Sequence, residues 1–344
     1  MPLLPPSEVP GGTQRVSTGA LPDSADIGEL LDEAHRRYRG VADGRVADYI
    51  PALAEAPPDG FGACIAGVGG ELISVGDARV EFSIQSVSKP FVFALVCDTI
   101  GHEVAQEKLG VNSTGLPFNS VMAIELSEDR TLNPMVNAGA IATTSLVPGA
   151  TSEVRWQFVL EGLSRFAGRE LVLDREVYDS EAATNLRNQG IAHLMDSYGR
   201  VYSDPDDATD TYTKQCSLLV TAEDLAVMGA TLADGGVNPV TRQRVVDAAT
   251  CTRVLAVLAT AGLYELTGDW LYEVGLPGKS GVSGGIVTIA PGKGGLGTWS
   301  PPLDEAGNSV RGQLLTRHVS EALGLNLFAS APSVEPLERP APAS

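Results

Sequence analysis

The chain has little positive charge and very little lysine. Its 344 residues carry 24 lysines and arginines against 43 aspartates and glutamates, a net charge of −19. Only five of the basic residues are lysines, at positions 89, 108, 214, 279 and 293. An acidic excess of this size argues against nucleic acid and against membranes as partners, because phosphate-rich surfaces repel it.

Side chains that bind metals or form cross-links are also scarce. The four cysteines (64, 97, 216, 251) and four histidines (35, 102, 193, 318) are scattered, and no pair has the spacing of a metal site. Their apolar neighbours indicate that the cysteines are reduced core residues. No apolar run reaches transmembrane length, and residues 1–23 lack the pattern of a secretory signal. We therefore expect a cytoplasmic protein.

Hydrophobic residues make up 43% of the chain, enough for a large core. The composition predicts a disordered tail at 1–23, a single domain at 24–329 and a flexible tail at 330–344. Strand patterns fall near both ends of the domain and helix patterns between them. This order predicts an α+β fold, an antiparallel sheet flanked by helices, with an α/β lobe at about 24–100 and 262–329 and an inserted all-helical lobe at about 101–261.

Periodicity and turn residues place the individual elements. We expect a helix at 24–39 and strands at 62–68, 71–76 and 81–84. Helices are expected at 101–109, 119–126, 138–146, 151–167, 179–197, 209–219, 222–234 and 241–261. Strands return at 270–274, 285–290 and 296–300, and a last helix covers about 310–323.

The segment Ser86-Val-Ser-Lys89 opens a long apolar stretch. Val87, Phe91 and Leu95 repeat at helical spacing, so we expect Ser86 at the N-terminus of a buried helix. Lys89 then lies one turn on, on the same face. A serine hydroxyl becomes a useful nucleophile when a neighbour accepts its proton, and burial lets a lysine do so by lowering its pKa.

A plainer interpretation is a serine that caps a helix, followed by a lysine that faces solvent. Two observations weigh against it. Residues 87–100 are almost wholly apolar, which leaves Lys89 as a charge in a buried-looking helix. A second motif, Lys279-Ser-Gly281, also occurs far downstream.

Three glycine-rich motifs suggest other enzymes and fail on context. Gly-Val-Ser-Gly-Gly at 281–285 matches the nucleophile elbow of α/β-hydrolases, but a strand is predicted next where that motif needs a helix. The dinucleotide-binding pattern matches 292–297, but Pro301 and Pro302 follow too soon for a helix. Gly-Lys-Ser at 278–280 resembles the end of a phosphate-binding loop, but Glu273 stands where that loop needs glycine.

The motifs at 86–89 and 279–281 together resemble the serine β-lactamase and penicillin-binding protein fold, in which Ser-x-x-Lys and Lys-Thr-Gly flank the site. The chain departs from it in having no well-placed Ser-Asp-Asn and a serine in Lys-Ser-Gly. A closer resemblance is to the serine-dependent glutaminase family within that fold. Seven segments carry it, in the family's order and over about residues 25–328: 47–51, 82–89, 133–140, 180–188, 210–217, 262–264 and 279–286.

This resemblance implies hydrolysis of L-glutamine to L-glutamate and ammonia, with no metal or cofactor, by a homo-oligomer that is a tetramer or a dimer. It makes Ser86 the nucleophile, Lys89 its base and Tyr264 a proton shuttle at the leaving nitrogen. The backbone N–H groups of Ser86 and Val282 would form the oxyanion hole. Lys279 would add positive field and help to keep Lys89 neutral by repulsion. For Tyr264, a structural role as a buried aromatic remains the plain alternative.

The resemblance also assigns residues to the α-amino and α-carboxyl groups of the substrate. Glu181 and Asn188 are seven positions apart, so on one continuous helix they share a face. An anionic Glu181 suits the ammonium group, although a charge in a first helical turn is common. Asn137, Asn188, Tyr212 and Tyr49 suit the carboxylate and the amide, with a turn residue as the alternative for Asn137.

Two other functions stay open. A β-lactamase-like or penicillin-binding hydrolase would need a pocket for a bulky acyl-amide and a secreted location. A glutamine sensor without activity could lose Ser86 or Lys89, and both residues are present.

Overall fold

The computed structural model describes residues 21–48, 50–117, 119–127 and 132–330. Most of both predicted tails lies outside these ranges, and so does Tyr49, one of the predicted substrate-binding residues. No helix in the described ranges is long and apolar enough to cross a lipid bilayer.

The main sheet has five strands in the order β2-β1-β8-β7-β6, and every neighbouring pair is antiparallel. Strands β1 (Gly62–Gly67) and β2 (Leu72–Gly76) come from the start of the domain. Strands β6 (Gly278–Ser280), β7 (Gly285–Ala290) and β8 (Gly294–Trp299) come from its end. The two segments meet where β1 pairs with β8, which confirms the predicted antiparallel sheet.

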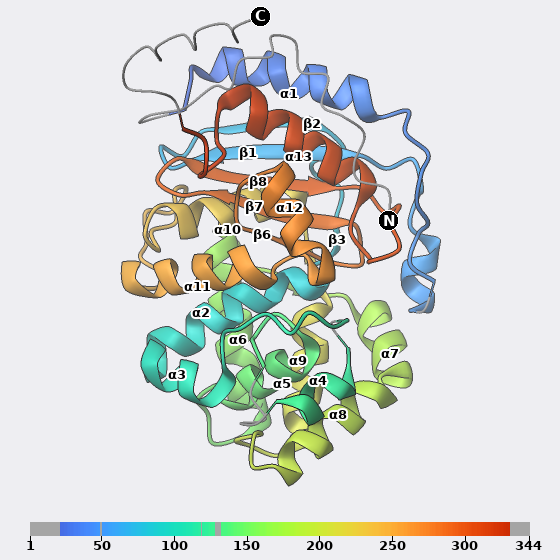
Figure 1. The fold of residues 1–344 in the computed structure, drawn as a ribbon, viewed down its shortest axis with the longest axis vertical. Coiled ribbons are helices and arrows are strands. Elements are labelled where there is room, and N and C mark those ends of the chain that lie inside the picture. The colour runs from blue at the N-terminus through green and yellow to red at the C-terminus, as the bar shows by residue number, and fades with distance from the viewer. Residues whose placement is uncertain (1–20, 49, 118, 128–131, 331–344) are drawn as a thin grey trace, which may run out of the picture.

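Helices cover both faces of this sheet (Figure 1). On one face, α1 (Ser24–Tyr38) and α13 (Val310–Leu323) share an apolar cluster with β1 and β8. On the other face, α10 (Ala222–Ala233) packs against β1, β7 and β8. Because α10 belongs in sequence to the predicted helical lobe, the chain crosses between the lobes more often than the prediction assumed. The division into lobes stays a prediction.

The close contact between α10 and β8 depends on glycine. A Cβ atom at Gly295 would lie 2.3 Å from the carbonyl oxygen of Ala226, and one at Gly297 would lie 2.1 Å from that of Ala222. No side chain fits at such distances, so these glycines are required for packing. The glycine run at 292–297 is therefore a turn followed by strand β8, which lies beneath a helix, and no helix follows it directly as a dinucleotide loop would need.

Most of the remaining helices form a block that lies below the main sheet in Figure 1. The block contains α2 (Lys89–Ile100), α3 (His102–Leu109), α4 (Val121–Leu126), α5 (Asn137–Ser145), α6 (Ser152–Ala167), α7 (Arg175–Thr184), α8 (Leu186–Ser197), α9 (Pro205–Cys216) and α11 (Ala248–Ala261). A small sheet, in the order β3 (Phe82–Ser83), β5 (Leu218–Val220), β4 (Val172–Leu173), joins the block to the segment before α2. Helix α2 is buried along most of its length and contacts α3, α5, α6 and α11.

The strand predicted at 270–274 is wrong, because these residues belong to α12 (Thr267–Glu273) and its C-cap. Thr267, Trp270 and Val274 are buried, whereas Tyr272 is 83% exposed. Burial at positions i, i+3 and i+7 is the helical period, and here it prevails over the high strand propensity of tryptophan, tyrosine and valine.

Three predicted helices have different bounds. The helix expected at 209–219 is α9 followed directly by strand β5. The one expected at 241–261 begins only at Ala248, where the side chain of Asp247 accepts a hydrogen bond from the amide of Thr250. The one expected at 179–197 is two helices, α7 and α8, which are separated at Asn185. At Ala248 a side-chain cap decided the boundary, and apolar periodicity alone does not detect a cap.

Candidate active site

Ser86 lies in the short 3₁₀ helix η2 (Gln85–Ser88), which leads directly into α2. No side chain forms the N-cap bond of either helix, so the interpretation of Ser86 as a capping residue is wrong. Gln85, immediately before it, has φ of +50°, a conformation that costs free energy in any residue with a Cβ. Strain directly beside a candidate nucleophile is typical of a functional turn.

Lys89 is the first residue of α2 and only 1% exposed, so the solvent-facing alternative is wrong. Its Nζ donates to the carbonyl oxygen of Met135 at 3.3 Å and to Oδ1 of Asn137 at 2.7 Å. Burial lowers the pKa of Lys89 from 10.5 to about 8, and the charges of Cys216 and Glu181 oppose that shift in part. With neutral oxygens as its hydrogen-bond acceptors, this lysine can lose a proton near neutral pH.

Asn137 connects Lys89 to other predicted substrate-binding residues. Its Oδ1 also accepts from the hydroxyl of Tyr212 at 3.2 Å, and its Nδ2 donates to Oδ1 of Asn188 at 3.0 Å. Burial raises the pKa of Tyr212 well above 10, so its hydroxyl remains a donor. Helices α5, α9 and α8 each contribute one of these three side chains, and the fold brings all three together beside Lys89.

The Met135 carbonyl reaches Lys89 because α5 packs tightly on the loop before it. A Cβ atom at Gly139 would lie 1.8 Å from the carbonyl oxygen of Asn133, so only glycine allows this approach. The side chain of Asn133 accepts from the amide of Met135 at 2.9 Å and donates to the carbonyl of Asn112 at 2.8 Å. These two hydrogen bonds and the close packing of Gly139 fix the position of the loop.

Glu181 and Asn188 do not lie on one continuous helix, and that part of the prediction is wrong. Glu181 is in α7 and Asn188 in α8. At the junction, Asn185 donates to the hydroxyl oxygen of Thr213 in α9 at 3.1 Å and accepts from Gln189 at 2.7 Å. Both bonds are made by the side chain of Asn185, and they anchor the residue at the junction of the two helices.

Glu181 is nevertheless buried within the same region. Its Oε2 accepts a long hydrogen bond, 3.5 Å, from Nε2 of Gln85. Burial raises the pKa of Glu181 from 4.5 to about 7, and the contacts with Gln85 and Lys89 partly oppose this. Gln85 is a residue that the sequence reasoning missed. Its position immediately before Ser86 was the available signal.

Tyr264 approaches Ser86 from the other side, in the short helix η3 (Tyr264–Leu266). Its hydroxyl donates to the carbonyl oxygen of Ser280 at 3.1 Å and also shares a hydrogen bond with the Ser86 side chain. Burial raises the pKa of Tyr264 strongly, so the phenol keeps its proton in this state. Tyr264 also has a positive φ, +55°, so strained backbone flanks the site on both sides.

Lys279 is buried, and like Lys89 it donates its hydrogen bond to an uncharged oxygen. Its Nζ donates to the carbonyl of Ser280 at 2.6 Å and lies 4.3 Å from the ring centre of Tyr264. Burial and then the charge of Lys89 lower the pKa of Lys279 well below 10.5. Repulsion between two like charges is mutual, so a charge on either lysine disfavours a charge on the other. The role of Lys279 in keeping Lys89 neutral stays a prediction.

The turn that carries Val282 lies against η2. A Cβ atom at Gly281 would be 3.1 Å from the carbonyl of Ile84 and 3.1 Å from the side chain of Val87. Strand β7 follows the turn, as the rejection of a nucleophile elbow at 281–285 requires. Among the described residues, the amide of Val282 donates no backbone hydrogen bond, so it is available to a ligand.

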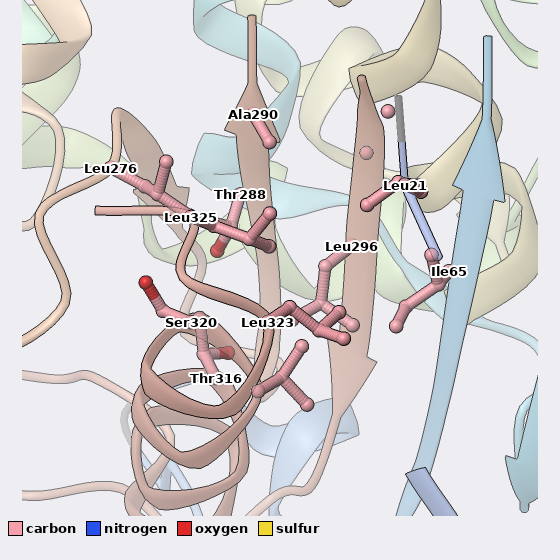
Figure 2. A pocket seen from close by; sticks show the side chains of 13 residues that line it. Leu21, Ile65, Leu276, Thr288, Ala290, Leu296, Thr316, Ser320, Leu323 and Leu325 are labelled. Carbon is pink, nitrogen blue, oxygen red and sulfur yellow. The ribbon is translucent and has the colours of Figure 1, made fainter. Parts of the chain in front are cut away.

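A separate cavity between α13 and the sheet holds none of the predicted site residues. Figure 2 shows Leu296, Leu323 and Leu325 projecting into this space, with Ile65 and Leu21 at its side. Its volume of about 20 Å³ leaves room for about one water molecule. This cavity is a packing defect of the apolar core.

The chain is similar to known proteins of one family. The sequence profile of the family described as Glutaminase matches residues 44–328. The chain is similar to "Glutaminase 2" of Yersinia pestis, with 61% identity over 320 residues that cover 93% of this chain and 94% of that protein. Among solved structures it is similar to a probable glutaminase, ybaS, at a TM-score of 0.88 and 45% identity, covering 90% and 100% of the two chains. It is also similar to a probable glutaminase from Bacillus subtilis complexed with 6-diazo-5-oxo-L-norleucine, at a TM-score of 0.81 and 30% identity, covering 88% and 97%.

Proposed function

The chain belongs to the glutaminase family, and on that premise we propose that it hydrolyses the side-chain amide of L-glutamine through an ester formed on Ser86. The observation that carries the proposal is Lys89, which is buried one turn after Ser86 and has a pKa of about 8. A base with such a pKa is partly deprotonated at neutral pH and therefore ready to accept the serine proton.

In the first half of the reaction, the Ser86 hydroxyl oxygen attacks the side-chain carbonyl carbon of glutamine. Its proton passes to the neutral amine of Lys89, and the carbonyl π electrons move onto oxygen. The backbone N–H groups of Ser86 and Val282 then stabilise this oxyanion. Removing one such donor typically costs 10²–10³ in rate, so both amides matter to the proposal.

Collapse of the intermediate breaks the bond between carbon and nitrogen. The leaving nitrogen takes a proton, so that ammonia and the ester on Ser86 form. Tyr264 suits this relay because its protonated hydroxyl shares a hydrogen bond with Ser86. Lys89 supplies the proton and is neutral again for the second half. Water then attacks the ester carbon and Lys89 accepts the water proton. The bond to the Ser86 oxygen breaks, Lys89 returns the proton to that oxygen, and L-glutamate is released.

We assign recognition of the α-groups to the side chains that lie around Lys89. An ionised Glu181 would bind the α-ammonium group, and binding that cation would lower the raised pKa of Glu181. Asn137, Asn188 and Tyr212 supply neutral donors for the α-carboxylate and the amide. Tyr49, outside the described residues, keeps its predicted place in this group.

The test of this proposal is release of ammonia by the purified protein. Glutamine should be hydrolysed, whereas asparagine, one methylene shorter, should be a poor substrate, because its amide falls short of Ser86 when the α-groups are bound. Nitrocefin serves as the β-lactam control. Hydrolysis of nitrocefin without that of glutamine would favour the penicillin-binding type of enzyme. Binding of glutamine without turnover would favour a sensor.

The resemblance further supports a homo-oligomer, and we propose a tetramer or a dimer. Light scattering coupled to size exclusion would measure its mass. We also propose a cytoplasmic location, which suits four free cysteines that are all buried. Cell fractionation with a labelled chain tests it, and recovery of the protein outside the cytoplasm would contradict it.

A further inference from the structure

A chain of buried hydrogen bonds ends on the peptide group that precedes Ser86. The hydroxyl of Ser88 donates to the carbonyl oxygen of Gln85 at 2.8 Å. The same Ser88 oxygen accepts from Nε2 of Gln215 at 3.3 Å. The hydroxyl of Thr144 lies 3.3 Å from the amide oxygen of Gln215, but its one proton serves the shorter bond to the carbonyl of Ala140 at 2.9 Å. Each of these side chains is at most 3% exposed.

The direction of these bonds determines what the chain does. Because Gln215 donates to the Ser88 oxygen, the hydroxyl proton of Ser88 points away from it and toward the Gln85 carbonyl. The two donors come from α9 and η2, the elements that also carry Tyr212 and Ser86.

The carbonyl of Gln85 and the amide N–H of Ser86 belong to one peptide group. In a planar trans peptide these two bonds point in opposite directions, so fixing the carbonyl fixes the N–H. Gln85 has a φ of +50°, which is unfavourable for a residue with a Cβ atom. The orientation of the peptide after it therefore depends on contacts with other residues. Relaxation of the peptide would turn the N–H away from the place where the oxyanion forms.

We propose that Ser88 and Gln215 are positioning residues that orient the Ser86 N–H as an oxyanion-hole donor. This inference rests on the proposed function. It assigns no contact with substrate to the two residues. Their effect should fall on kcat, because the oxyanion exists only in the transition state and intermediate, and it should spare binding of the α-groups.

The experiment compares Ser88→Ala with a matched control, Ser145→Ala. Ser145 in α5 also donates to the carbonyl three residues back, that of Ala142 at 2.6 Å. It also accepts one further hydrogen bond, from the amide of Tyr202 at 3.0 Å. Both substitutions therefore remove a buried serine with two bonds, but only one of the two serines touches Gln85.

For Ser88→Ala we expect kcat to fall about tenfold or more, with KM within about twofold of wild type. The rate of inactivation by 6-diazo-5-oxo-L-norleucine should fall by a similar factor, whereas the Kd for L-glutamate should stay at its wild-type value. Ser145→Ala should lower Tm by a similar amount and leave kcat within about twofold. Equal kcat values for the two variants at equal Tm loss would overturn the proposal, and so would an effect of Ser88→Ala on KM alone.

Gln215→Met is the second variant, because it keeps the length of the side chain and removes the donor to Ser88. It should lower kcat in the same direction, and an unchanged kcat would contradict the inference even if Ser88→Ala does not fold. Failure of the proposed function can be told apart from failure of the positioning role. If the proposed function is wrong, Ser86→Ala itself will retain activity. If only the positioning role is wrong, Ser86→Ala will be inactive and Ser88→Ala will have normal activity.

Discussion

The Nζ atom of Lys89 lies 2.7 Å from Oδ1 of Asn137, and that amide oxygen also accepts the hydroxyl of Tyr212. A lysine held in this way is hydrogen-bonded without being neutralised by a carboxylate. Burial therefore lowers the pKa of Lys89, and the charges of Cys216 and Glu181 offset this only in part. The Nδ2 atom of Asn137 donates to Asn188, so Asn137 contacts both the proposed base and the other predicted substrate-binding residues.

Ser86→Ala should lose glutaminase activity by several orders of magnitude and keep its fold, since it removes the nucleophile and one small hydroxyl group only. Ammonia release gives the activity, and circular dichroism checks the fold. As a direct identification, 6-diazo-5-oxo-L-norleucine should form one covalent adduct, which peptide mapping places on Ser86. A folded alanine variant with more than about a tenth of wild-type turnover, or an adduct on Ser283 or Cys216, would exclude this nucleophile.

The pH profile of kcat/KM should rise with a midpoint near the pKa of Lys89 in the free enzyme, about 8. The sign follows from the role, because only the neutral amine accepts a proton and its fraction grows as the pH passes the pKa. Lys89→Ala should remove most activity. Lys89→Arg should not restore it, because a guanidinium remains charged. Near wild-type rates for Lys89→Arg would mean that this position supplies only charge and would move the role of base to Tyr264.

Glu181→Gln should raise KM for glutamine strongly, because it removes a charge-assisted contact with the α-ammonium group. Initial rates over a range of glutamine concentrations measure this. As a matched test on the substrate, glutamine acylated at its α-amine should be a poor substrate of the wild type. Similar wild-type rates for free and N-acylated glutamine would assign the ammonium group to another residue.

The same substitution should stabilise the substrate-free protein at alkaline pH. The pKa of Glu181 is raised from 4.5 to about 7, so the folded state holds a proton that the unfolded state has lost between these values. Stability due to this residue is therefore highest at low pH and falls as pH rises toward 7, by on the order of 3 kcal/mol at most. Thermal unfolding should give Glu181→Gln a higher Tm than wild type at pH 8, and a smaller difference at pH 5. An equal difference at both pH values would show that the carboxyl group does not titrate in this range.

The sequence alone identified the family and much of the architecture. The order of strand and helix patterns predicted an α+β fold, and the two lysine motifs with the seven family segments predicted a glutaminase, because local spacing and residue type carry that information. The break at Asn185 was not predicted, since the hydrogen bond from Asn185 to Thr213 in α9 exists only in the folded chain. Periodicity also could not reveal that α10 lies on the sheet, where Gly297 meets the Ala222 carbonyl.

Tertiary structure decided what each charged group does. From sequence, Lys89 and Lys279 were two lysines in two motifs, with the second helping to keep the first neutral. In the folded chain both are desolvated, and the pKa of Lys279 is lowered further by the charge of Lys89. Desolvation depends on what surrounds a side chain in three dimensions, and segments more than a hundred residues apart supply those surroundings here. The proposed orientation of the peptide before Ser86 depends on the same kind of contact, because its donor Ser88 accepts from Gln215 in α9.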